Sequence, residues 1–470
     1  MNTSSLAKTN RRQFLGTTAT AVAAFSLVPR HVLGGPRFVP PSEKVNIALI
    51  GAGGQGRTNL RSLFQQADAQ IVAVADPVES VSLEEFYYKG MGGRKPIKAE
   101  IEKHHSTGGR NFRCAEYEDF RVMLEKEKAI DAVLCATPDH LHAYVSVVAM
   151  RAGKHCFCEK PLTHNIWEAR QVARVAKETG LATQMGNIGH STEGMRLTCE
   201  WIWDGAIGTV REVHAWVNAR RWNPTLLGRP TETPPVPAGV NWDLWLGPRE
   251  IRPYHPAYLP VKWRDFWAFG GGALGDFGCH DMDAACWALD LQTPLSIEPR
   301  SAGYKDSEIT PHGEMVFYHY GARGEQPPVK VVWYDGGLAP EHPPEMAPDD
   351  TLGARGVLFI GDKGCLLCGG AGGNPRFLSD AKMDAYKRPA KKLPRSKGHH
   401  RDWLDACKGG PAASSNFEYG ARLTEITLLG ILAVRLGKGI EWDAENMKVK
   451  NASQAEAILK GTYRKGWEVV

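Results

Sequence analysis

The sequence lacks a long hydrophobic run. The mildly apolar stretch at residues 15–28 is the candidate for a membrane span. It carries no charge but is rich in Ala and Thr, and it is shorter than the roughly 20 apolar residues that span a bilayer. The sequence also lacks a fixed-period repeat, so nothing indicates a solenoid or a propeller. With 470 residues, 43% hydrophobic and 23% charged, it has the composition of a soluble globular protein that is too long for one core. Two domains are therefore expected.

The N-terminus has no charged side chain between Arg12 and Arg30. Arg11 and Arg12 are followed by Gln13-Phe14-Leu15 and then by the apolar stretch, and this order resembles a twin-arginine export signal. We expect residues 1–34 to be that signal, with 32–34 as the cleavage site. The expected location is the periplasm, with no stable membrane span in the mature form. Anchoring to the membrane is the alternative if the signal stays uncleaved.

The sequence lacks a strong excess of charge. Removing residues 1–34 takes away four cations and no acid, which lowers the formal net charge from +5 to +1. Nucleic-acid binding needs clustered cations along a groove, so a nucleic-acid partner is not expected.

Metal ligands with close spacing are also scarce. The chain has ten cysteines, but the close pairs Cys156/Cys158 and Cys365/Cys368 have no second pair of ligands beside them, as a zinc site would require. Twin-arginine substrates fold in a compartment that keeps thiols reduced. We expect buried, reduced thiols and no metal.

A glycine-rich motif follows the first apolar run of the globular part. Residues 45–50 predict a strand, and they are followed by Gly51-Ala52-Gly53-Gly54-Gln55-Gly56 and then by a segment with helical periodicity. In this context the first glycine permits the tight turn, the second lets the backbone approach a pyrophosphate, and the third lets helix and strand pack closely. The helix N-terminus then presents free N–H groups to the phosphates. A surface turn is the alternative.

An acid follows the second predicted strand. Asp76 comes directly after the apolar residues 69–75, where the dinucleotide fingerprint places a carboxylate that accepts hydrogen bonds from the adenosine ribose. A carboxylate repels a 2′-phosphate, so NAD is expected rather than NADP.

The chain divides into two regions of different composition. From residue 43 to about 190, strand-like runs at 45–50, 71–75, 130–136, 155–158 and 182–186 alternate with helical ones at 56–66, 120–126, 142–152 and 166–179. This alternation is typical of a doubly wound parallel sheet, and residues 80–110 interrupt it. Residues 191–470 are rich in Trp and predict a second, sheet-containing domain. Its helical segment at 421–436 is expected to pack in the core.

Polar residues follow the later strands of the first region. Thr137-Pro138-Asp139-His140 follows one strand, and Glu159-Lys160-Pro161 follows the next, where doubly wound folds bind ligands. Pro161 keeps Lys160 extended, so its ammonium group can point into a cleft. A surface lysine is the alternative.

A second glycine run leads into a predicted helix. It reads Gly270-Gly271-Gly272 and is followed by Asp276 and His280, which share a helix face because they are four residues apart. A carboxylate beside an imidazole orients it for general-base work. A helix-capping Asp with a structural His is the alternative.

Together these motifs resemble the Gfo/Idh/MocA family over residues 44 to about 440. The resemblance implies an N-terminal Rossmann domain, a C-terminal α+β domain with an open, mostly antiparallel sheet, and a homodimer or homotetramer. It implies Lys160, Asp276 and His280 as the catalytic set. The expected NAD-binding residues are Gly51, Gly53, Gly54, Gln55, Gly56, Asp76, Thr137, Pro138, His140, His142, Glu159 and Lys160.

The expected function is NAD-dependent oxidation of a sugar or polyol hydroxyl, with the cofactor tightly bound because free NAD is not expected outside the cytoplasm. The clustered Trp residues suit stacking on sugar faces, although most of them should be core. One alternative is a redox-neutral hydrolase or lyase, similar to the NAD-dependent α-N-acetylgalactosaminidases of the family. It would oxidise C3 transiently and eliminate the C1 substituent. The other alternative is a non-catalytic NAD-binding scaffold.

Overall fold

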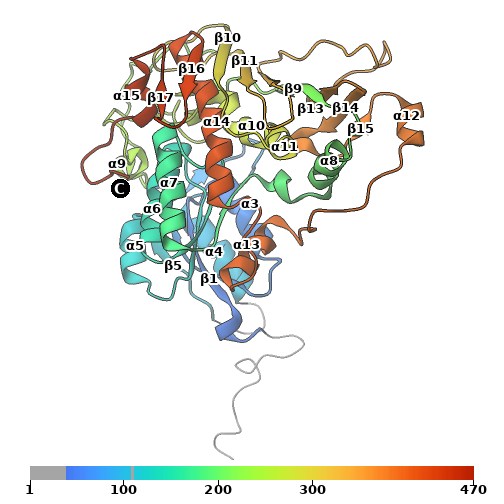
Figure 1. Cartoon of the computed structure of the whole chain (residues 1–470). Coiled ribbons are helices and arrows are strands. Elements are labelled where there is room, and N and C mark those ends of the chain that lie inside the picture. Colours follow the sequence, from blue (N-terminus) through green and yellow to red (C-terminus); the bar gives the residue numbers. More distant parts are fainter. Residues whose placement is uncertain (1–38, 107–110, 470) are drawn as a thin grey trace, which may run out of the picture.

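The computed structural model describes residues 39–106 and 111–469, which form two lobes (Figure 1). The predicted export signal, residues 1–34, lies outside the described residues.

The N-terminal lobe is built on a six-stranded sheet in which every described pair is parallel, in the order β5-β2-β1-β6-β7-β8. Its strands are β1 (Val45–Ile50), β2 (Ala69–Ala75), β5 (Ala115–Tyr117), β6 (Ala132–Cys135), β7 (His155–Cys158) and β8 (Thr183–Met185). Its helices are α3 (Gly54–Leu63), α4 (Arg94–His105), α5 (Phe120–Lys126), α6 (Asp139–Arg151) and α7 (Ile166–Thr179). The predicted Rossmann fold is confirmed. The strand order reverses between β1 and β6, and ligands of such sheets bind at this point.

The segment that interrupts the predicted alternation has two parts. Strands β3 (Val81–Ser82) and β4 (Met91–Gly92) form a short antiparallel hairpin. Helix α4 then packs on β2 and β5 as an ordinary crossover helix of the sheet. Among the described residues of this segment, the hairpin is the addition to the Rossmann pattern, and the charged residues of α4 obscured its helical period in the sequence.

The C-terminal lobe contains a nine-stranded sheet in the order β15-β14-β13-β9-β12-β11-β10-β16-β17. All described neighbours are antiparallel except β9 and β12, so the predicted mostly antiparallel sheet is confirmed. The strands are β9 (Val210–Val217), β10 (Ser296–Ala302), β11 (Gly313–Tyr320), β12 (Val329–Tyr334), β13 (Arg355–Gly361), β14 (Gly364–Gly369), β15 (Arg376–Phe377), β16 (Ile440–Asp443) and β17 (Lys448–Val449).

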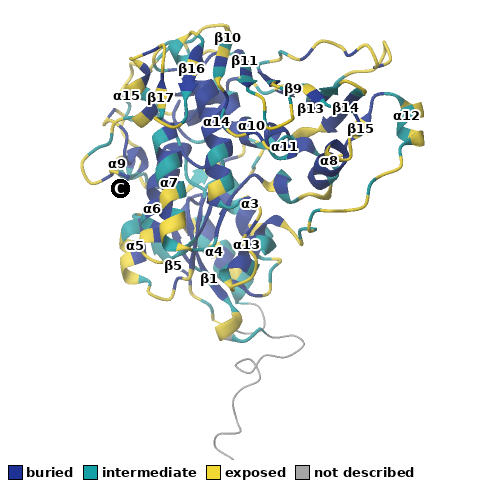
Figure 2. Ribbon diagram, viewed as in Figure 1, coloured by how far each residue is buried: buried dark blue, intermediate teal, exposed yellow. Residues whose placement is uncertain are grey.

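Two helices link this sheet to the Rossmann lobe. Helix α14 (Phe417–Leu436) packs against α7 and β10, and it is buried along most of its length (Figure 2). Helix α10 (Gly272–Asp281) packs against α14. No helix in the described ranges combines the length and the apolar character that crossing a bilayer requires.

The remaining helices lie around these elements. They are α8 (Glu193–Trp203), α9 (Trp242–Leu246), α11 (Asp283–Ala288), α12 (Asp380–Ala385), α13 (His399–Cys407) and α15 (Ala455–Lys460), with 3-10 turns at Pro41–Glu43, Ile188–Ser191, Lys262–Asp265 and Gly370–Gly372. Helix α13, late in the chain, returns to the first lobe (Figure 1). There Arg401 donates to both carboxylate oxygens of Asp68 at 2.6 and 3.0 Å, and the buried Trp403 packs in the Rossmann core.

Candidate active site

A cavity of about 340 Å³ lies between the two lobes, beyond the carboxyl ends of β1 and β6. It brings together twelve of the residues predicted from the sequence. They are Gly51, Gly53, Gly54, Gln55, Asp76, Thr137, Pro138, His142, Glu159, Lys160, Asp276 and His280. Gly56 and His140 do not line it.

The glycine loop has the geometry that a dinucleotide requires. Gly51 has φ +91°, and a Cβ there would lie 2.5 Å from the backbone of Ala136. A Cβ on Gly56 would lie 2.1 Å from the carbonyl oxygen of Gly51, so this glycine serves helix–strand packing. A Cβ on Gly53 would meet nothing within 4 Å, which leaves its cavity side open for a pyrophosphate.

Asp76 closes the adenosine end of the cavity. Its two carboxylate oxygens accept hydrogen bonds from the backbone N–H groups of Ala52 at 2.6 Å and Val78 at 2.7 Å. Burial raises the pKa of Asp76 to about 6, and these hydrogen bonds oppose that rise. The group is therefore mainly ionised at pH 7 and suits a ribose with two hydroxyl donors. These residues fit an NAD cofactor.

A cross-lobe ion pair lies at the opposite end. Lys160 Nζ donates to Asp276 Oδ1 at 2.6 Å and to its backbone oxygen at 2.8 Å, and Arg264 Nε lies 3.2 Å from the same Oδ1. Burial alone would lower the pKa of Lys160, but Asp276 outweighs it and the pKa is raised. The pKa of Asp276 is lowered because Arg264 and Lys160 outweigh its burial. Lys160 is therefore a fixed ammonium group.

His280 lies one helical turn after Asp276 and faces the same cavity. Burial lowers its pKa well below the ordinary value, and the charges of Lys160 and Arg355 add to this effect. Within the described ranges, no group forms a hydrogen bond with its ring. The expected Asp276–His280 pair is replaced by the Asp276–Lys160 pair, because the carboxylate turns to the ammonium of the other lobe. A neutral imidazole with a free lone pair can accept a proton.

Glu159 is buried beneath the glycine loop. Its Oε1 accepts from Gln55 Nε2 at 3.1 Å and from Asn59 Nδ2 at 2.8 Å. His400 Nε2 contacts the amide oxygen of Asn59 at 3.1 Å. Glu159 thus ties the start of α3 to the end of β7 and positions the cofactor loop.

The two predicted histidines of α6 have mainly structural contacts. His140 packs against Trp245 and Phe269, and its Nε2 lies 2.9 Å from the carbonyl oxygen of Trp245. His142 Nδ1 lies 2.6 Å from the carbonyl oxygen of Pro161, and its Nε2 lies 2.8 Å from that of Thr137. His142 therefore bridges the two loops that follow β6 and β7.

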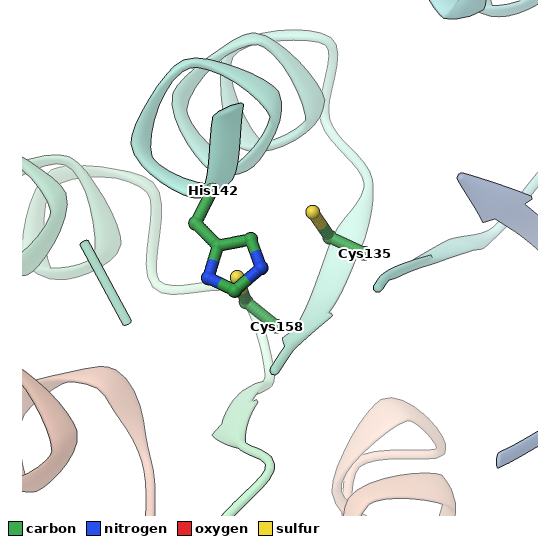
Figure 3. A group of neighbouring side chains, drawn as sticks. All are labelled: Cys135, His142 and Cys158. Atoms are coloured by element: carbon green, nitrogen blue, oxygen red, sulfur yellow. The ribbon is translucent and has the colours of Figure 1, made fainter. Parts of the chain in front are cut away.

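His142 also lies beside two thiols (Figure 3). Atoms of Cys135, Cys158 and His142 that are able to bind a metal lie within 4.8 Å of one another. A carbonyl oxygen lies within 2.8 Å of each ring nitrogen and occupies the position that an ion would take. All ten cysteines lie in the described ranges and are free; nine are buried and Cys407 is half-buried.

Sequence reasoning assigned no role to four further cavity residues. Tyr88, from the β3–β4 hairpin, covers Gly54: a Cβ on that glycine would lie 2.1 Å from the Tyr88 ring. Arg264 and Arg355 reach the cavity from the C-terminal lobe. Asp139 begins α6, and burial raises its pKa to about 8. Only Asp139 lay in a recognised motif; the others are brought in by tertiary packing.

Two family models match this chain. One is described as the oxidoreductase family with an NAD-binding Rossmann fold and matches residues 45–187; the other is the C-terminal alpha/beta domain of the same family and matches residues 213–322. Together they cover more than half of the chain. The chain belongs to the Gfo/Idh/MocA family. Its N-terminal lobe is accordingly an NAD-binding Rossmann domain.

The relatives of this Gfo/Idh/MocA protein are named for different activities. It is 27% identical over 171 residues to a 2,7-anhydro-N-acetylneuraminate hydratase of Mediterraneibacter gnavus, covering 36% of this chain and 39% of the relative. It is 27% identical over 280 residues to the levoglucosan dehydrogenase of Pseudarthrobacter phenanthrenivorans, covering 58% and 60%. A glycosyl hydrolase family 109 protein of Stenotrophomonas maltophilia is 32% identical over 149 residues, covering 32% and 29%. The matches span less than two thirds of each relative.

The fold is shared with solved structures. The WlbA dehydrogenase of Bordetella pertussis, in complex with NADH and UDP-GlcNAcA, superposes with a TM-score of 0.57 at 14% identity, over 85% of this chain and 99% of that one. At this identity the likeness concerns the fold alone.

Proposed function

We propose that this protein is an NAD-dependent oxidoreductase that acts on a hydroxyl group of a sugar or polyol, with Lys160, Asp276 and His280 as its catalytic set. One observation carries the proposal: a fixed ammonium and a free neutral imidazole, from different lobes, face the cavity that begins at the glycine loop. A non-catalytic scaffold has no use for this arrangement.

The residues of the cavity divide the chemistry among them. NAD, when bound, supplies the hydride acceptor and donor. His280 accepts the proton of the substrate hydroxyl, because its lowered pKa keeps it neutral. Lys160 stabilises the oxygen as it becomes negative, and Asp276 keeps that lysine charged and in place. Arg264 supplies a second cation beside the same carboxylate.

The proposal extends to the location and assembly of the protein. Residues 1–34 would direct export to the periplasm as a folded holoprotein, cleaved or retained as an anchor, and the mature chain would form a homodimer or homotetramer. Retention of NAD during export is supported by the β3–β4 hairpin, whose Tyr88 lies over Gly54 of the cofactor loop.

A second candidate is redox-neutral cleavage of a glycoside. Elimination of a C1 substituent requires a proton donor for the leaving oxygen, and Asp139 is a buried cavity acid whose pKa of about 8 keeps it protonated at pH 7. The hydratase and glycosyl hydrolase among the relatives favour this route. Lys160 and His280 would serve either reaction.

One experiment separates these candidates. The purified protein is denatured, and the supernatant is assayed for NAD. The native holoprotein is then given aryl glycosides and free sugars without added cofactor. Reduced cofactor that accumulates with free sugars supports net oxidation, whereas release of the phenol without such accumulation supports cleavage. Absence of both products across the panel would contradict both candidates.

A further inference from the structure

Arg355 occupies the wall of the cavity contributed by the C-terminal sheet. It is the first residue of β13, and its Nε donates to both carboxylate oxygens of Asp281 at 2.9 and 2.8 Å. Asp281 is fully buried, and its Oδ1 also accepts from the backbone N–H of Ala371 at 2.7 Å. The Nε side of this guanidinium is therefore held in place by Asp281.

Two further contacts fix the orientation of the guanidinium. Its centre lies 5.0 Å from the centroid of the Phe277 ring, and a Cβ on Gly370 would lie 2.8 Å from Arg355 Nε. The side chain keeps 33% exposure, and it lines the cavity. In the described part of the chain, no acceptor is paired with its Nη1 or Nη2. These two parallel donors are available to a ligand.

The catalytic end of the cavity is rich in charged groups. Its cations are Lys160, Arg264 and Arg355. Three carboxylates face them: Asp276, bonded to Lys160; Asp281, bonded to Arg355; and Glu159, where the charge of Lys160 opposes the rise in pKa that burial causes. Asp139 is mostly protonated at pH 7 because burial raises its pKa to about 8. The ionised groups nearly balance, so a ligand would be recognised by the open edge of the Arg355 guanidinium rather than by net charge.

We propose that Arg355 binds a carboxylate of the substrate, so that the substrate is an acidic sugar such as a uronic acid. Two parallel N–H donors match the two oxygens of a carboxylate, and this bidentate pairing fixes the orientation as well as the affinity. Arg355, His280 and Lys160 line the same cavity. A sugar held at Arg355 would lie in the cavity that His280 and Lys160 also face. This inference rests on the proposed function for the reacting hydroxyl and adds the class of substrate.

Binding to the NAD-loaded protein tests the inference without turnover. Calorimetry compares methyl glucosides with methyl glucuronides, and the galacto and manno pairs likewise. We expect at least one acid to bind about tenfold or more tightly than its neutral partner, and this preference to weaken at high salt. Arg355→Met should remove the preference while changing the affinity for the neutral sugar less than about threefold, since only the charge-assisted contact is lost.

The variants need controls for folding. Arg355→Met leaves the buried Asp281 unpaired, so the double variant with Asp281→Asn tests the same loss without a stranded charge. Arg300→Met, at an exposed position on β10, is the matched control and should keep the preference. Arg355→Lys should keep it in part.

The inference is overturned if neutral sugars bind as tightly as their acids, if Arg355→Met causes equal losses of affinity for both classes, or if no acid binds. Tighter binding of a sugar phosphate than of every acid would also overturn it. Failure of the proposed function has a different signature, since an acid would then bind through Arg355 with neither cofactor reduction nor phenol release.

Discussion

Lys160 Nζ and Asp276 Oδ1 are 2.6 Å apart, although the two residues are separated by 116 positions in sequence and belong to different lobes. This ion pair joins the loop after β7 to helix α10, and both of its residues line the cavity. It fixes the charge of Lys160 and leaves His280 as the neutral partner.

Lys160→Met and His280→Ala should each lower turnover by about 10² to 10⁴-fold, because each removes either the stabilising cation or the proton acceptor. NAD content should be retained, since neither residue holds the pyrophosphate end. Turnover and released NAD are measured together. His319→Ala, at a half-buried position on β11 that does not line the cavity, should leave both unchanged. Full turnover in both site variants would refute the catalytic set.

The affinity for NAD should depend on the ionisation of Asp76. Its pKa is raised to about 6, and ribose hydroxyls donate to the charged form, so binding lowers that pKa. The affinity should therefore be constant above about pH 7 and weaken by up to tenfold per pH unit as the pH falls through 6. Titration of cofactor-free protein with NADH measures this effect. Asp76→Asn should bind weakly at every pH with a flat profile; a profile like that of the wild type would assign the titration to another group.

Gly53→Ala should affect the affinity for NAD, whereas Gly56→Ala should affect the stability of the fold. The methyl group at 53 meets no protein atom within 4 Å and projects into open space beside the cavity, so NAD binding should weaken while the free energy of unfolding changes by less than about 0.5 kcal/mol. The methyl group at 56 would lie 2.1 Å from the Gly51 oxygen, so stability should fall by about 1–3 kcal/mol or more. Denaturant melts of cofactor-free protein, with NADH titrations, check both. Equal stability losses would contradict this assignment.

The Cys135, His142 and Cys158 cluster should bind no metal, because a carbonyl oxygen lies against each ring nitrogen of His142, at 2.6 and 2.8 Å, where an ion would have to sit. Metal analysis of the purified protein should show less than one equivalent, and a chelator should leave turnover unchanged. His142→Gln, which keeps one hydrogen-bonding arm, should lower activity through the position of the β6 and β7 loops. Stoichiometric zinc that is lost in this variant would overturn the interpretation.

The sequence was sufficient for those parts of the site that depend on local pattern. The glycine loop is recognisable because strand, turn and helix are contiguous, and Lys160 because the end of a parallel strand places it at the binding edge. The spacing of Asp276 and His280 correctly predicted a shared helix, but helical spacing reports only neighbours on the same helix. It could not show that a lysine from the other lobe takes the carboxylate.

Arg355, Arg264 and Tyr88 were beyond sequence reasoning for the same physical reason. Each reaches the cavity through tertiary packing: Arg355 from the start of strand β13, Arg264 from a 3-10 turn, and Tyr88 from a hairpin that lies over a glycine. His140 shows the opposite case. Its motif predicted a contact with the cofactor, whereas its ring lies against the backbone carbonyl oxygen of Trp245 and does not line the cavity.

The return of α13 to the first lobe has a consequence for the working cycle. Through Arg401 and Trp403, helix α13 attaches the C-terminal part of the chain to the nucleotide-binding lobe. A wide opening of the two lobes about a hinge would break these contacts together with the Lys160–Asp276 ion pair. Substrates should therefore enter and leave through the opening of the cavity without separation of the two lobes. For the same reason the two lobes should unfold in a single cooperative step.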